Sequence, residues 1–234
     1  MARGTLPRSV CAAVLAVGTL TGGWAEPPSE PRPEKALEQA RQLVRLVETM
    51  QAHYRSLGAF RAPFELRYVS STFGGEQAES GTLHVVPPAK MLWDYDDPED
   101  QRAVFDGSTW WLVSHEDQTV TRREVEAGAG HRSPLIDLLA GDVDLLTIFS
   151  GRVVAPEAAD GRVVLELLPR EPREQVDLVV VTMTPDPGTI HRIEVVGPLG
   201  GSHVLELGEP VQEEPLPVGR FEVTVPEGYT LLEE

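Results

Sequence analysis

Cysteine, basic residues and long apolar runs are all scarce in this chain. Its one cysteine, Cys11, lies near the N-terminus, and 20 Lys and Arg residues stand against 37 Asp and Glu, which gives a net charge of −17. Nucleic acids and anionic membrane surfaces are bound through basic faces, so this balance argues against both as partners. The scarcity of cysteine argues against disulfides, thiol nucleophiles and zinc–thiolate sites.

Motifs for catalysis and for metal binding are missing as well. None of the six histidines stands in an H-E-x-x-H spacing, and there is no G-x-S-x-G and no phosphate-binding glycine loop. The acidic run Asp94–Asp100 lacks the central glycine and the distal glutamate of a calcium loop, so we interpret it as a solvated turn. We predict a binding protein with no catalytic residue, metal or cofactor. Because carboxylates are abundant, a secreted hydrolase with an unrecognised carboxylate site stays an alternative.

The first 34 residues have the features of an export signal followed by a leader. Arg3 and Arg8 give the N-terminal region a positive charge, and the apolar run Val10–Leu20 follows. Gly23-Trp24-Ala25 is a small-x-small cleavage site. The apolar run is too short to span a membrane, and a buried helix is the alternative interpretation. We predict a signal peptide over 1–25, a proline-rich disordered leader over 26–34, and a single domain over 35–234.

Pro33–Leu57 has the periodicity of an amphipathic helix, which Gly58 ends. The next stretch, Phe60–Ser70, alternates apolar and polar residues with a period of two, as a half-buried antiparallel strand does. Both patterns predict one apolar side that packs against the rest of the chain. The helix places Leu37, Ala40, Val44, Val47 and Tyr54 on that side, and the strand places Phe60, Ala62, Phe64, Leu66 and Tyr68 there.

Four short strands separated by turns are predicted after a polar turn at Thr72–Ser80. Pro87-Pro88 ends the first strand, and Asp106-Gly107 is a tight turn after the third. Three of the four tryptophans fall in this window. Adjacent strands with large apolar residues in register build a wide apolar surface that another part of the chain or a ligand must cover. The strands are Thr82–Val86, Lys90–Tyr95, Arg102–Phe105 and Thr109–His115.

Two short apolar helices, Pro134–Leu139 and Val143–Phe149, interrupt the strands. Because they are apolar on more than one side, they suit a cover over a sheet, although ordinary core helices have the same composition. The predicted fold is α+β: a strongly curved antiparallel sheet, an incomplete β-barrel of about eleven strands, covered by the N-terminal helix and short lid helices. The remaining predicted strands are Gln118–Val125, Arg152–Ala155, Arg162–Leu168, Val176–Met183, Ile190–Val196, His203–Leu207 and Phe221–Val225.

A series of short motifs, taken in order, resembles the outer-membrane lipoprotein carrier protein (LolA) family over Leu37–Leu231. The resemblance implies a soluble periplasmic chaperone, in which helices close an incomplete barrel over an apolar cavity for acyl chains. Family members commonly carry an arginine at the position of Pro87, which ties down the lid, and tend to have Gln at Leu66 and Arg at Leu92. The motifs are Phe60-x-Ala62-x-Phe64, Gly81-x-Leu83, Pro88, Trp93, Pro98, Asp106-Gly107-x-x-x-Trp111, Leu167-x-Pro169-Arg170, Gly188-Thr189-Ile190-His191 and Phe221-x-Val223-x-x-Pro226-x-Gly228.

The resemblance also implies partners and site residues. The partners are acylated lipoproteins, an inner-membrane ABC transporter complex that delivers them, and an outer-membrane lipoprotein receptor, and the carrier acts as a monomer. A lipid-sensing regulatory module of the same fold is the alternative. We expect Phe60, Phe64, Leu66, Met91, Trp93, Tyr95 and Trp111 to line the acyl-chain cavity, and Leu135, Leu138, Leu139 and Phe149 to belong to the lid.

Overall fold

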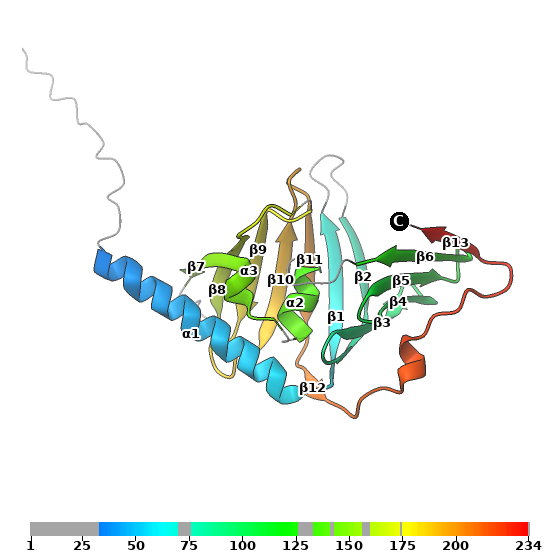
Figure 1. The fold of residues 1–234 in the computed structure, drawn as a ribbon, viewed down its shortest axis with the longest axis horizontal. Coiled ribbons are helices and arrows are strands. Elements are labelled where there is room, and N and C mark those ends of the chain that lie inside the picture. Colours follow the sequence, from blue (N-terminus) through cyan, green and yellow to red (C-terminus); the bar gives the residue numbers. More distant parts are fainter. Residues whose placement is uncertain are drawn as a thin grey trace, which may run out of the picture. The chain divides into compact units, whose positions relative to one another are not determined.

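The computed structural model describes residues 33–69, 76–125, 133–140, 143–155, 160–173 and 175–233. The predicted signal peptide, and the predicted leader up to residue 32, lie outside the described residues. Three α-helices, thirteen strands and one 3-10 helix make up this part of the chain (Figure 1). They are α1 Pro33–Leu57, β1 Phe60–Val69, β2 Glu76–Val86, β3 Lys90–Asp97, β4 Gln101–Phe105, β5 Thr109–Ser114, β6 Thr119–Glu124, α2 Pro134–Ala140, α3 Leu145–Ile148, β7 Phe149–Ala155, β8 Val163–Pro169, β9 Leu178–Met183, β10 Ile190–Val196, β11 Ser202–Leu207, β12 Val211–Gln212, η1 Val218–Phe221 and β13 Thr230–Glu233.

The strands form one sheet that is not closed into a barrel. Their order is β13-β6-β5-β4-β3-β2-β1-β11-β10-β9-β8-β7, with the short β12 paired to β1. All neighbours pair antiparallel except β13, which is parallel to β6. The described path therefore ends at β7 on one side and β13 on the other. This confirms the predicted α+β fold with a curved, incomplete barrel.

One side of the sheet, here called the inner face, packs against the helices. The main apolar cluster combines residues of α1, α2 and α3 with alternate residues of the strands. Figure 1 shows the two shorter helices on the same side of the sheet as α1. The burial alternation of β1 from Phe60 to Leu66 follows the period predicted from the sequence, because successive side chains of a strand point to opposite faces. Within the described residues, no helix has the length and hydropathy needed to cross a bilayer.

The C-terminal half of α1 is fixed to the sheet at close range. Met50 and Tyr54 are 0% and 2% exposed, and the Tyr54 hydroxyl accepts a hydrogen bond from the Ile190 amide at 3.2 Å. Gly188, in the turn between β9 and β10, has φ +104, and a Cβ there would lie 2.7 Å from the Met50 Cα. Only glycine allows the turn to approach the helix this closely.

Some sequence predictions about element boundaries are wrong. The predicted final strand Phe221–Val225 is instead the end of η1 and an irregular segment. Phe221 is buried against Leu92 and Val104 on the outer face of the sheet, so the chain crosses that face and adds its last strand, β13, further on. The predicted polar turn at Thr72–Ser80 is also too long, because β2 begins at Glu76 and pairs with β1 along its full length.

Candidate functional site

The inner face brings together six of the seven residues predicted to line a cavity. Phe60, Phe64, Leu66, Met91 and Trp93 are between 0% and 7% exposed, and Tyr95 packs partly buried against the same cluster. The Phe64 ring meets those of Trp93 and Tyr95 edge to face, with centroids 4.8 Å and 5.3 Å apart. These strands thus present a continuous apolar and aromatic surface.

Gly81 makes room for this aromatic group. It lies opposite both Phe64 on β1 and Tyr95 on β3. A Cβ at this position would lie 2.1 Å from the backbone oxygen of Asp94 and 2.8 Å from the Tyr95 Cα. Glycine therefore allows β2 and β3 to approach each other at the irregularity in their pairing, and leaves the inner face free for the two flanking rings.

Trp111 was predicted on the wrong face. Strand register aligns Met91, Phe105 and Trp110 on the inner face and places Trp111 with Leu92 and Val104 on the outer face. The Trp111 indole donates to Asp106 at 3.2 Å. Trp110 packs instead against Phe105 in the inner cluster, at 5.3 Å. Two adjacent tryptophans must point to opposite faces of a strand, and the sequence did not indicate which one points inward.

Helices α2 and α3, here called the lid, fill the space that was predicted to be a cavity. Ile136, Leu138 and Leu139 are 0–1% exposed and belong to the inner-face cluster, and Leu135 packs against it partly buried. Phe149, predicted in the second lid helix, is instead the first residue of β7, and it is fully buried. Side chains of the lid therefore occupy the inner face in this structure.

Two arginines of the loop between β8 and β9, here called the clamp, hold the two lid helices. The Arg173 guanidinium lies 3.5 Å from the Asp137 carboxylate of α2, and these side chains are 10% and 0% exposed. The Arg170 Nε donates to the Leu146 carbonyl of α3 at 3.0 Å, and its backbone amide donates to the Ile148 carbonyl at 2.9 Å. Arg173 also stacks over the Phe149 ring at 4.9 Å.

The residue at position 87 does not take part in holding the lid through a side-chain hydrogen bond. Pro87 is exposed in the turn between β2 and β3 and has no hydrogen-bond donor to offer the lid. The cationic contacts come instead from the other half of the sheet, through Arg170 and Arg173. A further polar contact joins α1 to the segment before α3, where the Gln51 amide donates to the Val143 carbonyl. The lid is therefore held by polar contacts at its rim and by apolar contacts beneath it.

A buried carboxyl group lies at one end of the inner face. Glu79 is 8% exposed, and the Tyr68 hydroxyl donates to it at 3.5 Å. Burial raises the pKa of Glu79, while hydrogen bonds from Tyr68 and Tyr95 oppose that shift. Burial, together with the Glu79 charge, raises the pKa of Tyr68 to about 12. The lining is thus apolar over most of its length and ends at a polar group of Glu79, Tyr68 and Tyr95.

The raised pKa of Glu79 predicts a pH dependence of stability. The folded state favours the protonated carboxyl, so this stabilising contribution is complete below the ordinary pKa of 4.5 and is lost as the pH rises through the folded pKa. Between about pH 4 and about pH 7, the wild type should therefore lose unfolding free energy relative to Glu79→Gln. Urea denaturation of both proteins at both pH values measures the difference. Glu99→Gln, at an exposed turn, is the charge-matched control. If Glu79→Gln and Glu99→Gln lost the same unfolding free energy over this pH range, the prediction would be contradicted.

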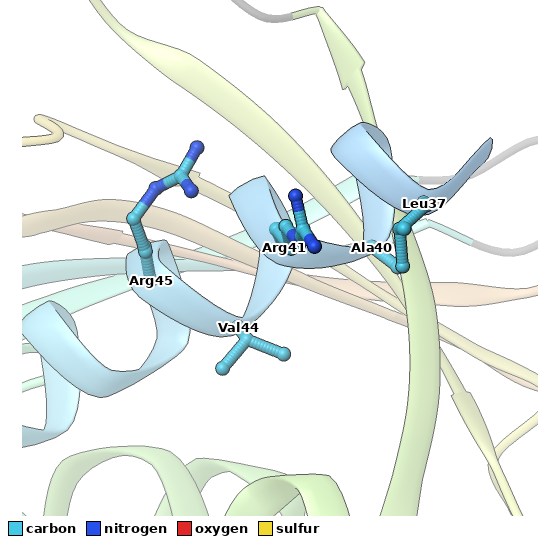
Figure 2. Close-up of a pocket in the computed structure, with 5 residues that line it drawn as sticks. All are labelled: Leu37, Ala40, Arg41, Val44 and Arg45. Carbon is cyan, nitrogen blue, oxygen red and sulfur yellow. The ribbon is translucent and has the colours of Figure 1, made fainter. Parts of the chain in front are cut away.

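The N-terminal half of α1 carries a separate, open hollow. Leu37 and Val44 are 53% and 38% exposed, in contrast to the buried stripe further along the helix. Leu37, Ala40, Arg41, Val44 and Arg45 line a hollow of about 400 Å³. Figure 2 shows Val44 projecting from the opposite side of the helix to Arg45. This hollow lies outside the covered inner face and is not the predicted cavity.

Taken together, the fold and the site define a class: an open, curled sheet with an apolar inner face under a small, clamped lid. The chain belongs to the outer membrane lipoprotein carrier protein LolA family, whose family model matches residues 55–224. The sequence resemblance to that family is confirmed.

Individual relatives agree with this assignment. The outer-membrane lipoprotein carrier protein of Methylobacillus flagellatus is 24% identical over 188 residues, which cover 80% of this chain and 89% of the relative. The one from Alkalilimnicola ehrlichii is 30% identical over 158 residues, or 67% and 69% of the two chains. Among solved structures, a LolA superfamily protein from Nitrosomonas europaea has a TM-score of 0.42 at 12% identity, covering 79% of this chain and 98% of its own.

Proposed function

We propose that this protein is a periplasmic carrier that shields the acyl chains of lipoproteins on its inner face and moves them from the inner to the outer membrane. One observation supports the proposal beyond family membership: the inner face is a continuous apolar surface covered by two short helices, of seven and four residues. Helix α2 has seven residues, too few for a stable helix on its own, so it depends on the packing that cargo would replace.

Displacement of the lid by cargo is energetically reasonable. Three fully buried aliphatic side chains of α2 contribute about 5–9 kcal/mol of apolar burial. One acyl chain of about fifteen methylene groups gains roughly 12 kcal/mol when it leaves water, at about 0.8 kcal/mol for each group. A cargo with two or three chains therefore outweighs the lid and the clamp together. No chemical step is required, only an apolar surface that opens and closes.

The proposed route needs a donor and an acceptor at opposite membranes. An inner-membrane ABC transporter complex would load the carrier, and an outer-membrane lipoprotein receptor would unload it. The acidic chain, with its net charge of −17, would not adhere to anionic lipid surfaces between the two steps. Release is as much part of this function as binding is.

Binding and release of an acylated peptide test the proposal. The purified protein should bind a diacylglyceryl-cysteine lipopeptide with one-to-one stoichiometry by native mass spectrometry, and should not bind the same peptide without acyl chains. It should then lose the lipopeptide to acceptor vesicles that display an outer-membrane receptor. Failure to bind the lipopeptide would contradict the carrier function, and binding without release would favour a lipid-sensing regulator of the same fold.

A further inference from the structure

Trp93 lies in a row of inner-face residues whose exposure rises from β2 to β5. Strand register aligns Leu83, Trp93, Ala103 and Leu112 in one row across β2, β3, β4 and β5. The exposed fractions of these four residues are 0%, 3%, 8% and 37%. Trp93 is therefore buried itself but lies two strands away from the row's exposed end.

The indole N–H of Trp93 is a buried donor that has no hydrogen-bond partner among the described residues. A buried donor without an acceptor is costly, and buried tryptophans usually find one. Trp111 on the outer face does so, by donating to Asp106 at 3.2 Å. The two tryptophans thus differ in whether the described residues provide an acceptor.

The neighbours of Trp93 offer little to complete this hydrogen bond. Leu83 and Ala103 flank it along the row, and the Phe64 ring lies edge to face at 4.8 Å. A water molecule needs two to four polar partners, which these apolar side chains do not provide. Within the polar group, Glu79 lies four residues along β2 from Leu83, about 13 Å away at the rise of an extended strand. Tyr95 lies nearer, two residues along β3 from Trp93 or about 7 Å, but its hydroxyl is hydrogen-bonded to Glu79.

We propose that the Trp93 indole N–H binds the carbonyl oxygen of the ester that joins an acyl chain to the glycerol of the cargo. This inference rests on the proposed carrier function and adds a polar subsite to it. A pure hydrocarbon would leave the donor unpaired, whereas an acyl ester brings an acceptor attached to an apolar chain. The subsite would then distinguish acylated cargo from other apolar molecules and set how deeply the chains enter.

A cycle of two proteins and two ligands tests this hydrogen bond. The ligands are a diacylglyceryl-cysteine lipopeptide and its dialkyl-ether analogue, which has the same chains and no carbonyl groups. The wild type should bind the ester about 3- to 10-fold more tightly than the ether, the size expected of one neutral hydrogen bond. Trp93→Phe should bind both equally. Trp111→Phe, which alters a tryptophan on the outer face, should keep the wild-type preference.

A measurement on the unaltered protein keeps the test independent of how well Trp93→Phe folds. The indole N–H resonance of Trp93 should move downfield when the ester lipopeptide binds, and should move less with the ether. Equal affinity of the wild type for ester and ether would overturn the inference, as would an ester preference that survives in Trp93→Phe. If neither lipopeptide binds the wild type, the carrier function itself fails, which separates the two conclusions.

Discussion

Replacing Arg173 with alanine should open the lid and raise the apparent affinity for an apolar fluorescent probe by about 10- to 100-fold. The substitution removes the guanidinium that lies 3.5 Å from the fully buried Asp137 carboxylate. Losing one partner of a buried ion pair costs about 3–5 kcal/mol, and this cost applies to the closed state, in which the carboxylate is buried. The apparent affinity for the probe scales with the fraction of the protein in which the inner face is uncovered. A variant whose lid is open more often should therefore bind the probe more tightly. Probe titration and thermal denaturation measure the two effects.

Arg152→Ala is the matched control for this prediction. Arg152 also pairs with a carboxylate, at 2.6 Å from Glu166, but its side chain is 71% exposed. Such a surface pair is worth about 0–1 kcal/mol, so neither probe affinity nor stability should change much. A double variant, Arg173→Met with Asp137→Leu, should restore both closure and stability, since apolar replacements of a buried pair are often neutral. Lower stability in Arg173→Ala with unchanged probe affinity would show that the lid does not limit access.

Gly81→Ala should lower the unfolding free energy by about 4 kcal/mol or more, among the largest effects of a single substitution. The added Cβ would lie 2.1 Å from the Asp94 backbone oxygen, and backbone atoms cannot move aside as a flexible side chain does. For a domain of this size the loss corresponds to a fall in melting temperature of roughly 8–16 °C. Calorimetry or urea denaturation measures it.

Gly219→Ala provides the comparison, because a Cβ at Gly219 meets nothing within 4 Å and its φ is not positive. The unfolding free energy of that variant should be within a few tenths of a kcal/mol of the wild-type value, or slightly higher. The prediction for Gly81 would be wrong if both variants had the same melting temperature. Such a result would mean that β2 and β3 can separate freely, and that the aromatic group of Phe64, Trp93 and Tyr95 does not require glycine.

The covered surface was largely predictable from local patterns, and the orientation of single residues was not. The alternation from Phe60 to Tyr68 predicted the inner side of β1, because a half-buried strand exposes every second residue. Trp110 and Trp111 have the same local pattern, and only pairing through Phe105 and Val104 decides which faces inward. Phe221 looked like part of a strand because its neighbours alternate, but its burial on the outer face comes from contacts over a hundred residues distant.

The clamp could not have been predicted from sequence. Arg173 and Asp137 are separated by 36 residues, and nothing in the spacing of either residue indicates that the loop between β8 and β9 reaches the lid. Arg170 belongs to the short motif Leu167-x-Pro169-Arg170, which by itself predicts no contact with the lid. Pro87 stands where family members commonly carry an arginine, whereas the arginines that contact the lid in this chain lie in the loop between β8 and β9.

The sequence by itself determined the helix, most of the strands and the apolar face of β1, because these follow from the periodicity of residues close together in the chain. It also carried the family resemblance. The tertiary structure decided which tryptophan faces inward, that the lid fills the inner face, that arginines of a distant loop contact the lid, and that the Trp93 donor has no partner among the described residues. Those features depend on strand register and on contacts between residues far apart in the chain, which local periodicity does not encode.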